Sequence, residues 1–280
     1  MPVSLSSALE QFLDALRCPT CRSRLHPDRG ALRCPAGHTF DIARHGYLSL
    51  LTGARAISGD DAAMACARHR FLSTGKFLPI RQAVTRLVAD AAQGTVLDVG
   101  CGTGYYLAGV LEQLPDARGL GLDASVRALR SAARAHERAA AATWDVFRPF
   151  PLADGVVDVV LDVFAPRNPS EFHRVLRPNG KLVVVRPTGR HLAELRSHVS
   201  AMVTIDPAKE QRLRRVLHPH FEAVATEQVE YRASLTRQEA LDLVGMTPSA
   251  RHLSRAEIDT DGRLPDCVTV SVLATAYRRR

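Results

Sequence analysis

One short stretch, residues 96–106, limits the fold of this chain more than any other part of the sequence. It reads VLDVGCGTGYY: an apolar run ends in the acid Asp98, and a helix-compatible run begins at Tyr105. Between them stand three glycines at alternate positions: Gly100, Gly102 and Gly104. Glycine suits a backbone that bends sharply and lies close to a ligand, because a Cβ atom would obstruct both. The stretch therefore predicts a buried parallel strand that turns tightly under a ligand and enters a helix.

The spacing of the glycines indicates which ligand the turn holds. The pattern here is G-x-G-x-G, whereas a dinucleotide pyrophosphate is held by G-x-G-x-x-G. A ligand without a diphosphate fits this spacing better, and we expect S-adenosylmethionine. A Rossmann-like domain that binds another ligand, or none, is the alternative.

Two further acids follow where the next two strands should end. Asp123 closes the apolar run GLGLD about 20 residues after the glycines, where a carboxylate can accept hydrogen bonds from both hydroxyls of a ribose. Asp145, in ATWDVF, stands where a third strand should end and could accept from an adenine amino group. We predict that both side chains, together with Asp98 and the three glycines, belong to the cofactor site.

Strand-like and helix-like segments alternate through this region. Two more strands are predicted at 156–164 and 181–187, the second directly after a Pro-Asn-Gly turn that ends at Gly180. Four β-turn-helix units in order predict an α/β fold, a doubly wound Rossmann-like sheet with helices on both faces. Alternating, β-branched segments at 223–235 and 268–278 should complete this sheet as an antiparallel edge pair.

Four potential metal ligands stand close together near the N-terminus. Cys18 and Cys21 form a C-x2-C pair, and Cys34 and His38 follow as C-x3-H. Three thiolates and one imidazole fill the four positions around a tetrahedral Zn²⁺, which gives a closed, structural site. The segment between the pairs predicts a β-hairpin around residues 27–30. We therefore predict a small zinc-binding β module, with cysteines that bind no metal as the alternative.

The positive charge of the chain is concentrated in its first third. The 280 residues carry a formal net charge of +8. Residues 1–93 contain 12 basic and 7 acidic residues, whereas residues 94–280 contain 25 and 22. This distribution fits a polyanionic partner that contacts mainly the N-terminal part, although a basic surface without a partner would also produce it.

The sequence gives no indication of a membrane-bound or secreted protein. No apolar run approaches the roughly 18 residues that span a bilayer, and the N-terminus lacks the basic start of a signal peptide. We expect a cytoplasmic protein whose six cysteines are reduced or bind metal.

These features divide the chain into three parts. Residues 1–55 form the zinc-binding module, residues 56–93 form a linker and a helical connection, and residues 94–280 form the cofactor-binding domain. Residues 52–61, which span the first of these divisions, read as a linker or mobile loop, and residues 61–92 are helical by pattern.

The helical connection contains a break between Ser73 and Lys76, and it carries several basic side chains. Arg68, Arg70 and Lys76 could contact phosphate, or they could lie on a solvated helix face. A second short helix is expected after residue 235, with Thr236 as its N-cap.

The order of the motifs resembles one family closely. A CPxC…C…H unit precedes an R-x-F-L-x-x-G helix turn, and VLDVGCGTGYY, FAP, GRHLAEL and GMTPSAR follow. Over about residues 16–255 the chain resembles the bacterial 23S rRNA guanine-N1 methyltransferases, the group that includes the tylosin-resistance enzymes. The resemblance implies a class I S-adenosylmethionine-dependent methyltransferase with an N-terminal zinc module that contributes to RNA recognition.

The resemblance also implies roles for individual residues. The zinc ligands of the family correspond to Cys18, Cys21, Cys34 and His38. Its cofactor-binding positions correspond to Phe77, Gly102, Thr103 and His191. Family members can carry Glu at the position of Thr103, and because the backbone of the loop does the binding, threonine should be tolerated there.

The substrate and the assembly are implied in the same way. The family methylates a guanine in hairpin 35 of 23S rRNA, at nucleotide 745 or 748. The composition of this chain is typical of a GC-rich genome, which favours 748, the position found in Gram-positive organisms. The resemblance further implies a homodimer that forms a cleft for the RNA hairpin, and methylation that gives resistance to tylosin-type macrolides.

Methyl transfer to guanine N1 needs a general base, because N1 carries a proton at neutral pH. The guanine must also leave its stack and be held within about 3–3.5 Å of the methyl group. Asp162, near the end of the strand at 156–164, is the acid best placed to act as this base, although a carboxylate there can also be structural. Phe164 could stack on the target base or cap the core.

Two other functions are compatible with the same motifs. A class I fold can methylate a small molecule, although the basic front third and the zinc module argue against it. A zinc-dependent RNA-binding protein without catalysis is the second, and the intact glycines and Asp123 argue against that one.

Overall fold

The computed structural model describes residues 5–51, 59–89, 94–199, 202, 209–252 and 264–280. Residues 52–58 of the predicted linker therefore lie outside the described residues. Among the described residues, no helix is long and apolar enough to cross a membrane.

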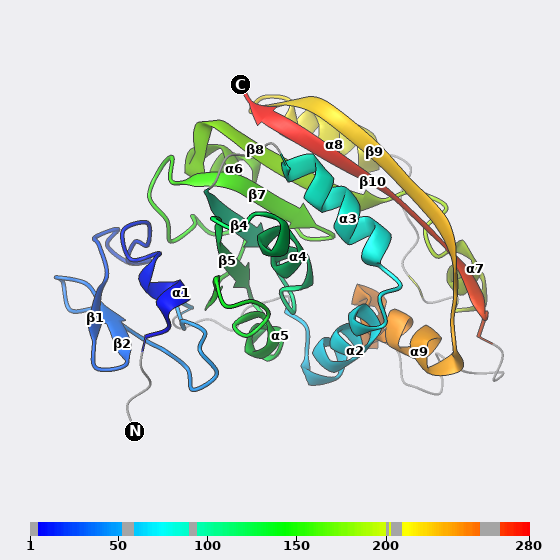
Figure 1. The fold of residues 1–280 in the computed structure, drawn as a ribbon, viewed down its shortest axis with the longest axis horizontal. Coiled ribbons are helices and arrows are strands. Elements are labelled where there is room, and N and C mark those ends of the chain that lie inside the picture. Colours follow the sequence, from blue (N-terminus) through cyan, green and yellow to red (C-terminus); the bar gives the residue numbers. More distant parts are fainter. Residues whose placement is uncertain (1–4, 52–58, 90–93, 200–201, 203–208, 253–263) are drawn as a thin grey trace.

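A seven-stranded sheet forms the centre of the molecule, and its strand order is β6-β5-β4-β7-β8-β10-β9 (Figure 1). The strands of the parallel part are β4 (Thr95–Val99), β5 (Arg118–Asp123), β6 (Ala139–Thr143), β7 (Val157–Val163) and β8 (Leu176–Pro187). At the other edge, β10 (Cys267–Arg279) pairs antiparallel with both β8 and β9 (Phe221–Ser234). The doubly wound sheet and its antiparallel edge pair are both confirmed.

The strand order reverses at β4, because β5 and β6 lie on one side of it and β7 and β8 on the other. Ligands of open α/β sheets bind beyond the carboxyl ends of the strands at such a reversal. The glycine turn after β4 and the acid at the end of β5 lie at this point.

Two hydrophobic clusters cover the two faces of the sheet, and neighbouring residues of a strand alternate between them. In β4, Val96 joins one cluster and Leu97 the other. The first cluster contains residues of α3 (Leu78–Val88), α4 (Tyr105–Gln113), α7 (Ala193–His198) and α9 (Arg237–Gly245). The second contains residues of α1 (Ser7–Glu10), α6 (Pro169–Val175) and α8 (Lys209–Leu217).

Local sequence patterns predicted several helix boundaries correctly. The predicted break in the helical connection separates α2 (Ala62–Ser73) from α3, and the N-cap of α2 is Asp61. Thr236 caps α9 as expected, and Glu239 completes a capping box with it. A short 3₁₀ turn, η1 (Pro248–His252), follows α9.

The Pro-Asn-Gly turn before β8 was predicted wrongly. The strand begins at Leu176 and contains these residues as an irregularity: Val157 of β7 pairs with Leu176, but Val159 pairs with Lys181. A Cβ at Gly180 would lie 2.7 Å from a Leu176 methyl carbon and 3.1 Å from the Asp158 carbonyl oxygen. The glycine therefore permits close packing inside a bulged strand, which a sequence pattern cannot distinguish from a turn.

The N-terminal residues form a three-stranded antiparallel sheet, β1 (His26–Asp28), β2 (Ala31–Arg33) and β3 (Thr39–Asp41). The predicted hairpin around residues 27–30 is confirmed as the β1–β2 connection. We call residues 5–51 the front module; in Figure 1 it is the blue part beside the β5–β6 edge of the large sheet.

The front module shares its core with the large sheet. Phe12, Leu16 and Leu48 are fully buried in the cluster that also contains Leu97 and Ala142 of the parallel strands. The connection between β6 and β7, residues 144–156, contains no helix. The front module therefore covers the part of the sheet face where a crossover helix would otherwise pack.

Backbone hydrogen bonds fix the front module at the edge strand β6. The Leu48 N–H donates to the Ala141 carbonyl at 2.9 Å, and the Thr143 N–H donates to the Leu48 carbonyl at 2.9 Å. The Thr143 hydroxyl accepts from the N–H groups of Leu50 and Leu51 at 2.9 and 3.1 Å. The edge of the sheet is thus paired and not open to solvent.

Candidate metal centre and cofactor site

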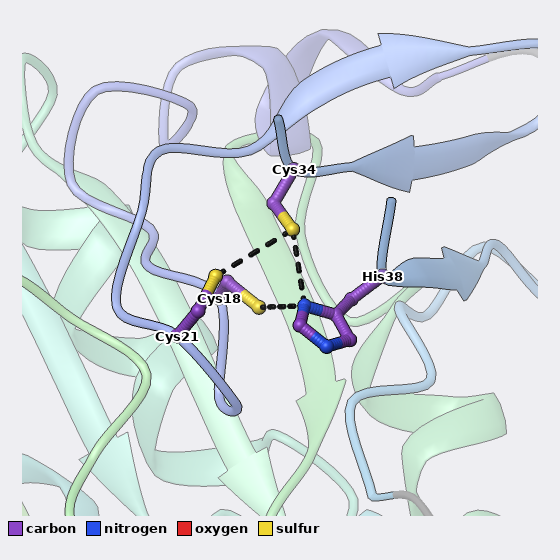
Figure 2. A group of neighbouring side chains, drawn as sticks. All are labelled: Cys18, Cys21, Cys34 and His38. Carbon is purple, nitrogen blue, oxygen red and sulfur yellow. Dashed lines mark hydrogen bonds between the residues drawn. The ribbon is translucent and has the colours of Figure 1, made fainter. Parts of the chain in front are cut away.

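The four predicted metal ligands meet at one point of the front module, at the ends of β2 and β3 and in the preceding loop (Figure 2). Their ligand atoms all lie within 4.8 Å of one another. His38 Nδ1 lies 3.6 Å from Cys18 Sγ and 3.2 Å from Cys34 Sγ, and the sulfurs of Cys21 and Cys34 are 3.6 Å apart.

These distances fit a tetrahedral Zn²⁺. Bond lengths of about 2.3 Å to sulfur and about 2.0 Å to nitrogen place two sulfurs about 3.8 Å apart and a sulfur and a nitrogen about 3.5 Å apart. Hydrogen bonding to Ser23 lowers the pKa of Cys21 to about 6, which favours the thiolate that a metal requires. Because all four positions would be filled by protein ligands, the zinc here is structural and has no place for a substrate.

The glycine turn after β4 has the conformation that its sequence predicts. Gly100 and Gly102 have φ angles of +71° and +54°, in the left-handed region that favours glycine. A Cβ at Gly100 would lie only 2.6 Å from the Cβ of Ala165, so the turn is packed against the residues that follow β7. Thr103 is buried beside these glycines, and Gly104 is the N-cap of α4.

Asp123 ties the glycine turn to the end of β5. Its carboxylate accepts from the Gly102 N–H at 2.8 Å and from the Ser125 N–H at 2.7 Å. A carboxylate has about four lone-pair positions, so both oxygens can still accept from a ribose diol. Asp145, two residues beyond β6, accepts from the Phe147 N–H at 3.0 Å and lies 3.7 Å from Arg148.

Two buried polar groups beside the turn have no hydrogen-bond partner among the described residues: Asp98 Oδ2 and the Tyr106 hydroxyl. Asp98 is 2% exposed, and burial together with Asp123 and Asp162 raises its pKa to about 8. Buried polar groups without partners are costly, and a ligand can complete them. S-adenosylmethionine carries ammonium and hydroxyl donors as well as acceptors, so its chemistry fits this set.

An aromatic group lies at the same edge of the sheet. Phe164 follows β7 directly, has a left-handed φ of +57° and is 38% exposed. Its ring is stacked on His191, with centroids 5.9 Å apart and an interplanar angle of 23°. The Phe77 ring centroid lies 6.2 Å from that of His191, and the Tyr106 centroid lies 6.5 Å from that of Phe164.

His191 is held as a neutral imidazole. Burial and the nearby Arg196 lower its pKa to about 4. Its Nδ1 atom accepts from the Ser271 N–H at 3.2 Å, which leaves the proton on Nε2. The residue lies in the turn before α7, because Leu192, in a left-handed conformation, is the N-cap of that helix.

Asp162, the predicted general base, lies at the end of β7 and is fully buried. One of its carboxylate oxygens is 3.3 Å from Arg167 Nε. It therefore lies behind the protein surface, two residues before Phe164 in the chain. Its role as a general base stays a prediction.

An ion pair over the glycine turn was missed at the sequence level. Arg68 on α2 donates Nε to Asp60 at 2.6 Å and Nη2 to the Met246 carbonyl at 2.8 Å. A Cβ at Gly102 would lie 3.2 Å from Arg68 Cδ, so this side chain lies on the turn. The Ser125 hydroxyl donates to the Asp60 carbonyl at 2.6 Å and joins the pair to the β5 end. Asp60 lies outside α2, and no helical spacing signals such a pair.

Arg70 and Lys76, the other two candidates for phosphate contacts, are also paired. Arg70 donates to Asp242 of α9 at 2.5 Å, and Lys76 Nζ lies 3.8 Å from Glu239. The proposed phosphate contacts of Arg68, Arg70 and Lys76 therefore compete with carboxylates or carbonyls of the protein itself. The sequence suggested either phosphate contacts or a solvated helix face for these residues, and neither interpretation included the ion pairs within the fold that the structure shows.

Comparison with known proteins identifies both parts of the chain. Residues 16–54 match the zinc-ribbon family model described as "RlmA, N-terminal", and residues 96–180 match a methyltransferase domain model. A methyltransferase bound to the Trm112 activator of Haloferax volcanii has a similar fold, with a TM-score of 0.50 and 20% sequence identity over 79% of this chain and 99% of that one.

Two relatives extend the similarity over nearly the whole chain. A protein of Micromonospora griseorubida, named as a candidate 23S rRNA (guanine-N(1)-)-methyltransferase, is 45% identical over 96% of this chain and 98% of its own. The 23S rRNA (guanine(748)-N(1))-methyltransferase of Streptomyces fradiae is 42% identical over 94% of this chain and 96% of its own. With its zinc ribbon and its S-adenosylmethionine-dependent methyltransferase domain, the chain belongs to the 23S rRNA (guanine-N1)-methyltransferase family.

Proposed function

We propose that this enzyme methylates N1 of guanine 748 in hairpin 35 of 23S rRNA. The observation that carries the proposal is the 42% identity, over nearly the full length of both chains, to the Streptomyces fradiae enzyme named for that nucleotide. The joining of a Cys₃His module to a glycine-turn cofactor site in one shared core supports it.

The residues around the cofactor site have distinct tasks in this reaction. S-adenosylmethionine, when bound, supplies an activated methyl group. The glycine turn, Thr103 and Asp123 hold the cofactor, and Asp98 completes its polar contacts. Phe77 and His191 line the same edge of the sheet.

The target guanine stacks on the exposed face of Phe164. This ring lies next to the glycine turn, because Ala165, the residue that follows Phe164, packs on Gly100. Stacking on an aromatic face compensates for the stacking energy that a base gives up when it leaves its helix. The proton on N1 must leave as the methyl group arrives, and Asp162 is the residue we test as its acceptor.

The test is methylation of 23S rRNA by the purified, zinc-loaded enzyme. Primer extension on the product should stop one nucleotide before position 748, and an rRNA fragment with adenine at 748 should accept no methyl group. A stop one nucleotide before position 745 would mean that the enzyme methylates nucleotide 745 and not 748. Methyl transfer to a quinone or a phenol, with none to rRNA, would overturn the proposal in favour of the small-molecule alternative.

Cofactor binding distinguishes the proposed enzyme from the second alternative, a zinc-dependent RNA-binding protein without catalysis. Calorimetry should show that the folded, zinc-loaded protein binds S-adenosylmethionine, and absence of binding would favour a protein that only binds RNA.

Three further properties follow from this function as proposals. The enzyme acts in the cytoplasm, where rRNA is modified, as a homodimer whose cleft accepts the hairpin. Methylation at 748 raises resistance to tylosin-type macrolides. Light scattering would give the mass in solution, and growth of a sensitive strain with and without this gene on tylosin would test the resistance.

A further inference from the structure

A turn of the front module is packed against the helix that follows Asp123. The turn spans residues 43–47 and is closed by the Ala43 N–H, which donates to the Tyr47 carbonyl at 2.9 Å. Tyr47 is buried in a small cluster with Leu129 and Ala132 of α5 (Val126–Ala132). The front module and the cofactor domain thus meet directly at α5.

Positive charge gathers on both sides of this junction. Arg44 and His45 stand in the turn, and Arg127, Arg130 and Arg134 follow on α5 and just beyond its end. Spacings of three and four residues place these three arginines on one side of the helix. We call this set of five residues the junction cluster.

The junction cluster contains more donors than its own groups can satisfy. Arg44 Nε lies 3.3 Å from His45 Nε2, and Arg134 Nη2 lies 3.2 Å from His45 Nδ1. A neutral imidazole accepts at only one nitrogen, so one of these two guanidinium groups faces an N–H. The Nε of Arg130 is buried and has no hydrogen-bond partner among the described residues.

Carboxylates do not balance this charge. Among the described residues, none of Arg44, Arg127, Arg130 and Arg134 forms an ion pair with an acid. Burial and the surrounding arginines lower the pKa of His45, so the imidazole adds no charge of its own at neutral pH. This contrasts with Arg68 and Arg70, which are both paired with aspartates.

We propose that the junction cluster binds the phosphodiester backbone of the substrate RNA. The inference rests on the proposed rRNA substrate. Phosphate oxygens are pure acceptors, and the planar guanidinium group binds them with two parallel hydrogen bonds. Such contacts set the register of a nucleic acid without reading its sequence. The cluster combines residues of the front module with residues of α5, the helix that starts just after Asp123, so it aligns the hairpin with both the zinc ribbon and the cofactor site.

The test is the salt dependence of RNA binding. For the double variant R44A/R134A, we expect affinity for the hairpin fragment to fall roughly tenfold at low salt. The slope of log Kobs against log salt should decrease by about 1 for each phosphate group that the variant no longer binds. Affinity for S-adenosylmethionine and zinc content should not change, since no cofactor or metal ligand is altered.

Two further variants serve as controls. R86A/R278A removes two exposed arginines that pair with Glu227 and Glu222 on the distant strand β9, and its salt slope should equal that of the wild type. R44K/R134K keeps the charge and should keep most of the slope, while losing the paired hydrogen bonds.

The outcomes separate this inference from the proposed function. Wild-type affinity and slope in R44A/R134A, or an equal loss in R86A/R278A, would overturn the junction cluster as a phosphate site. If the wild-type enzyme methylates no rRNA, the proposed function has failed, whatever the slopes are.

Discussion

The side chain of Phe164 has the most direct consequence for the reaction at the level of single residues. A large apolar ring in a left-handed backbone, partly open to solvent, is costly unless it serves a purpose. Its sequence context left both stacking and core packing open and slightly favoured core packing, whereas its 38% exposure favours stacking.

Substitution of Phe164 tests this role. F164A should lower kcat/KM for the rRNA fragment by the value of one stacking contact, about 1–3 kcal/mol, with unchanged affinity for S-adenosylmethionine. F164Y should restore most of the activity, because it keeps the aromatic face. F147A, at a more exposed phenylalanine in the β6–β7 connection, is the control. A loss of activity in F147A but not in F164A would show that the base stacks elsewhere.

Asp162 calls for a different readout, because it is fully buried and lies against Arg167. If it accepts the N1 proton, D162N should lower kcat by roughly 10²–10⁴-fold, and the acidic limb of the pH–rate profile should disappear. Calorimetric cofactor affinity and the melting temperature identify a variant that is merely misfolded. A profile that keeps its wild-type shape in D162N would exclude this residue as the base.

The raised pKa of Asp98 predicts how the free energy of unfolding changes with pH. Its folded pKa of about 8 lies above the ordinary value, so the folded state binds the proton more tightly than the unfolded state. The resulting stabilisation is complete below about pH 4, the unfolded pKa, and is lost as the pH rises toward 8. D98N cannot ionise and should therefore show a flatter decline of stability between pH 5 and 8. Urea denaturation at several pH values measures this, and parallel curves for both proteins would contradict it.

At the scale of the elements, the Thr143 hydroxyl adds two hydrogen bonds to the contact between the front module and β6. T143V keeps the shape of the side chain and removes the acceptor for two N–H groups of the front module. Buried donors without a partner cost about 1–3 kcal/mol, so the free energy of unfolding should fall by that amount. T226V, on the outer strand β9, is the matched control and should be nearly neutral. Equal effects of the two variants would contradict the role of Thr143.

The elements also show how far the sequence could predict this structure. The strand–glycine turn–helix unit, the zinc ligands and the Thr236 cap were all predictable, because each depends on residues close together in the chain. The bulge in β8 and the placement of His191 before α7 were not. Both depend on pairing with distant strands, namely β7 for the bulge and Ser271 of β10 for the histidine.

At the scale of the whole molecule, the sequence predicted parts but not how they are joined. The divisions at residues 55 and 93 remain a prediction, and the shared core of the front module and the sheet appeared only in three dimensions. No periodicity relates Leu48 to Ala142 or Arg68 to Asp60. Such contacts are decided by packing between segments that are far apart or irregular.

Removal of zinc tests this shared core. Chelation, or C21S, should destabilise the front module and, because its core continues into the sheet, lower the melting temperature of the entire protein in a single transition. Differential scanning calorimetry with and without chelator measures this. C66S, at a cysteine on α2 outside the metal cluster, is the control. Two separate transitions would mean that the front module melts independently.

The helix-free connection between β6 and β7 has a consequence for how this family can diversify. A fragment that starts at residue 94 would leave an apolar sheet face bare, so the methyltransferase domain cannot simply be detached and fused to another module. An exchange of zinc ribbons between relatives must also carry the β6 surface against which the ribbon packs. The zinc ribbon and the methyltransferase domain are therefore inherited together in this architecture.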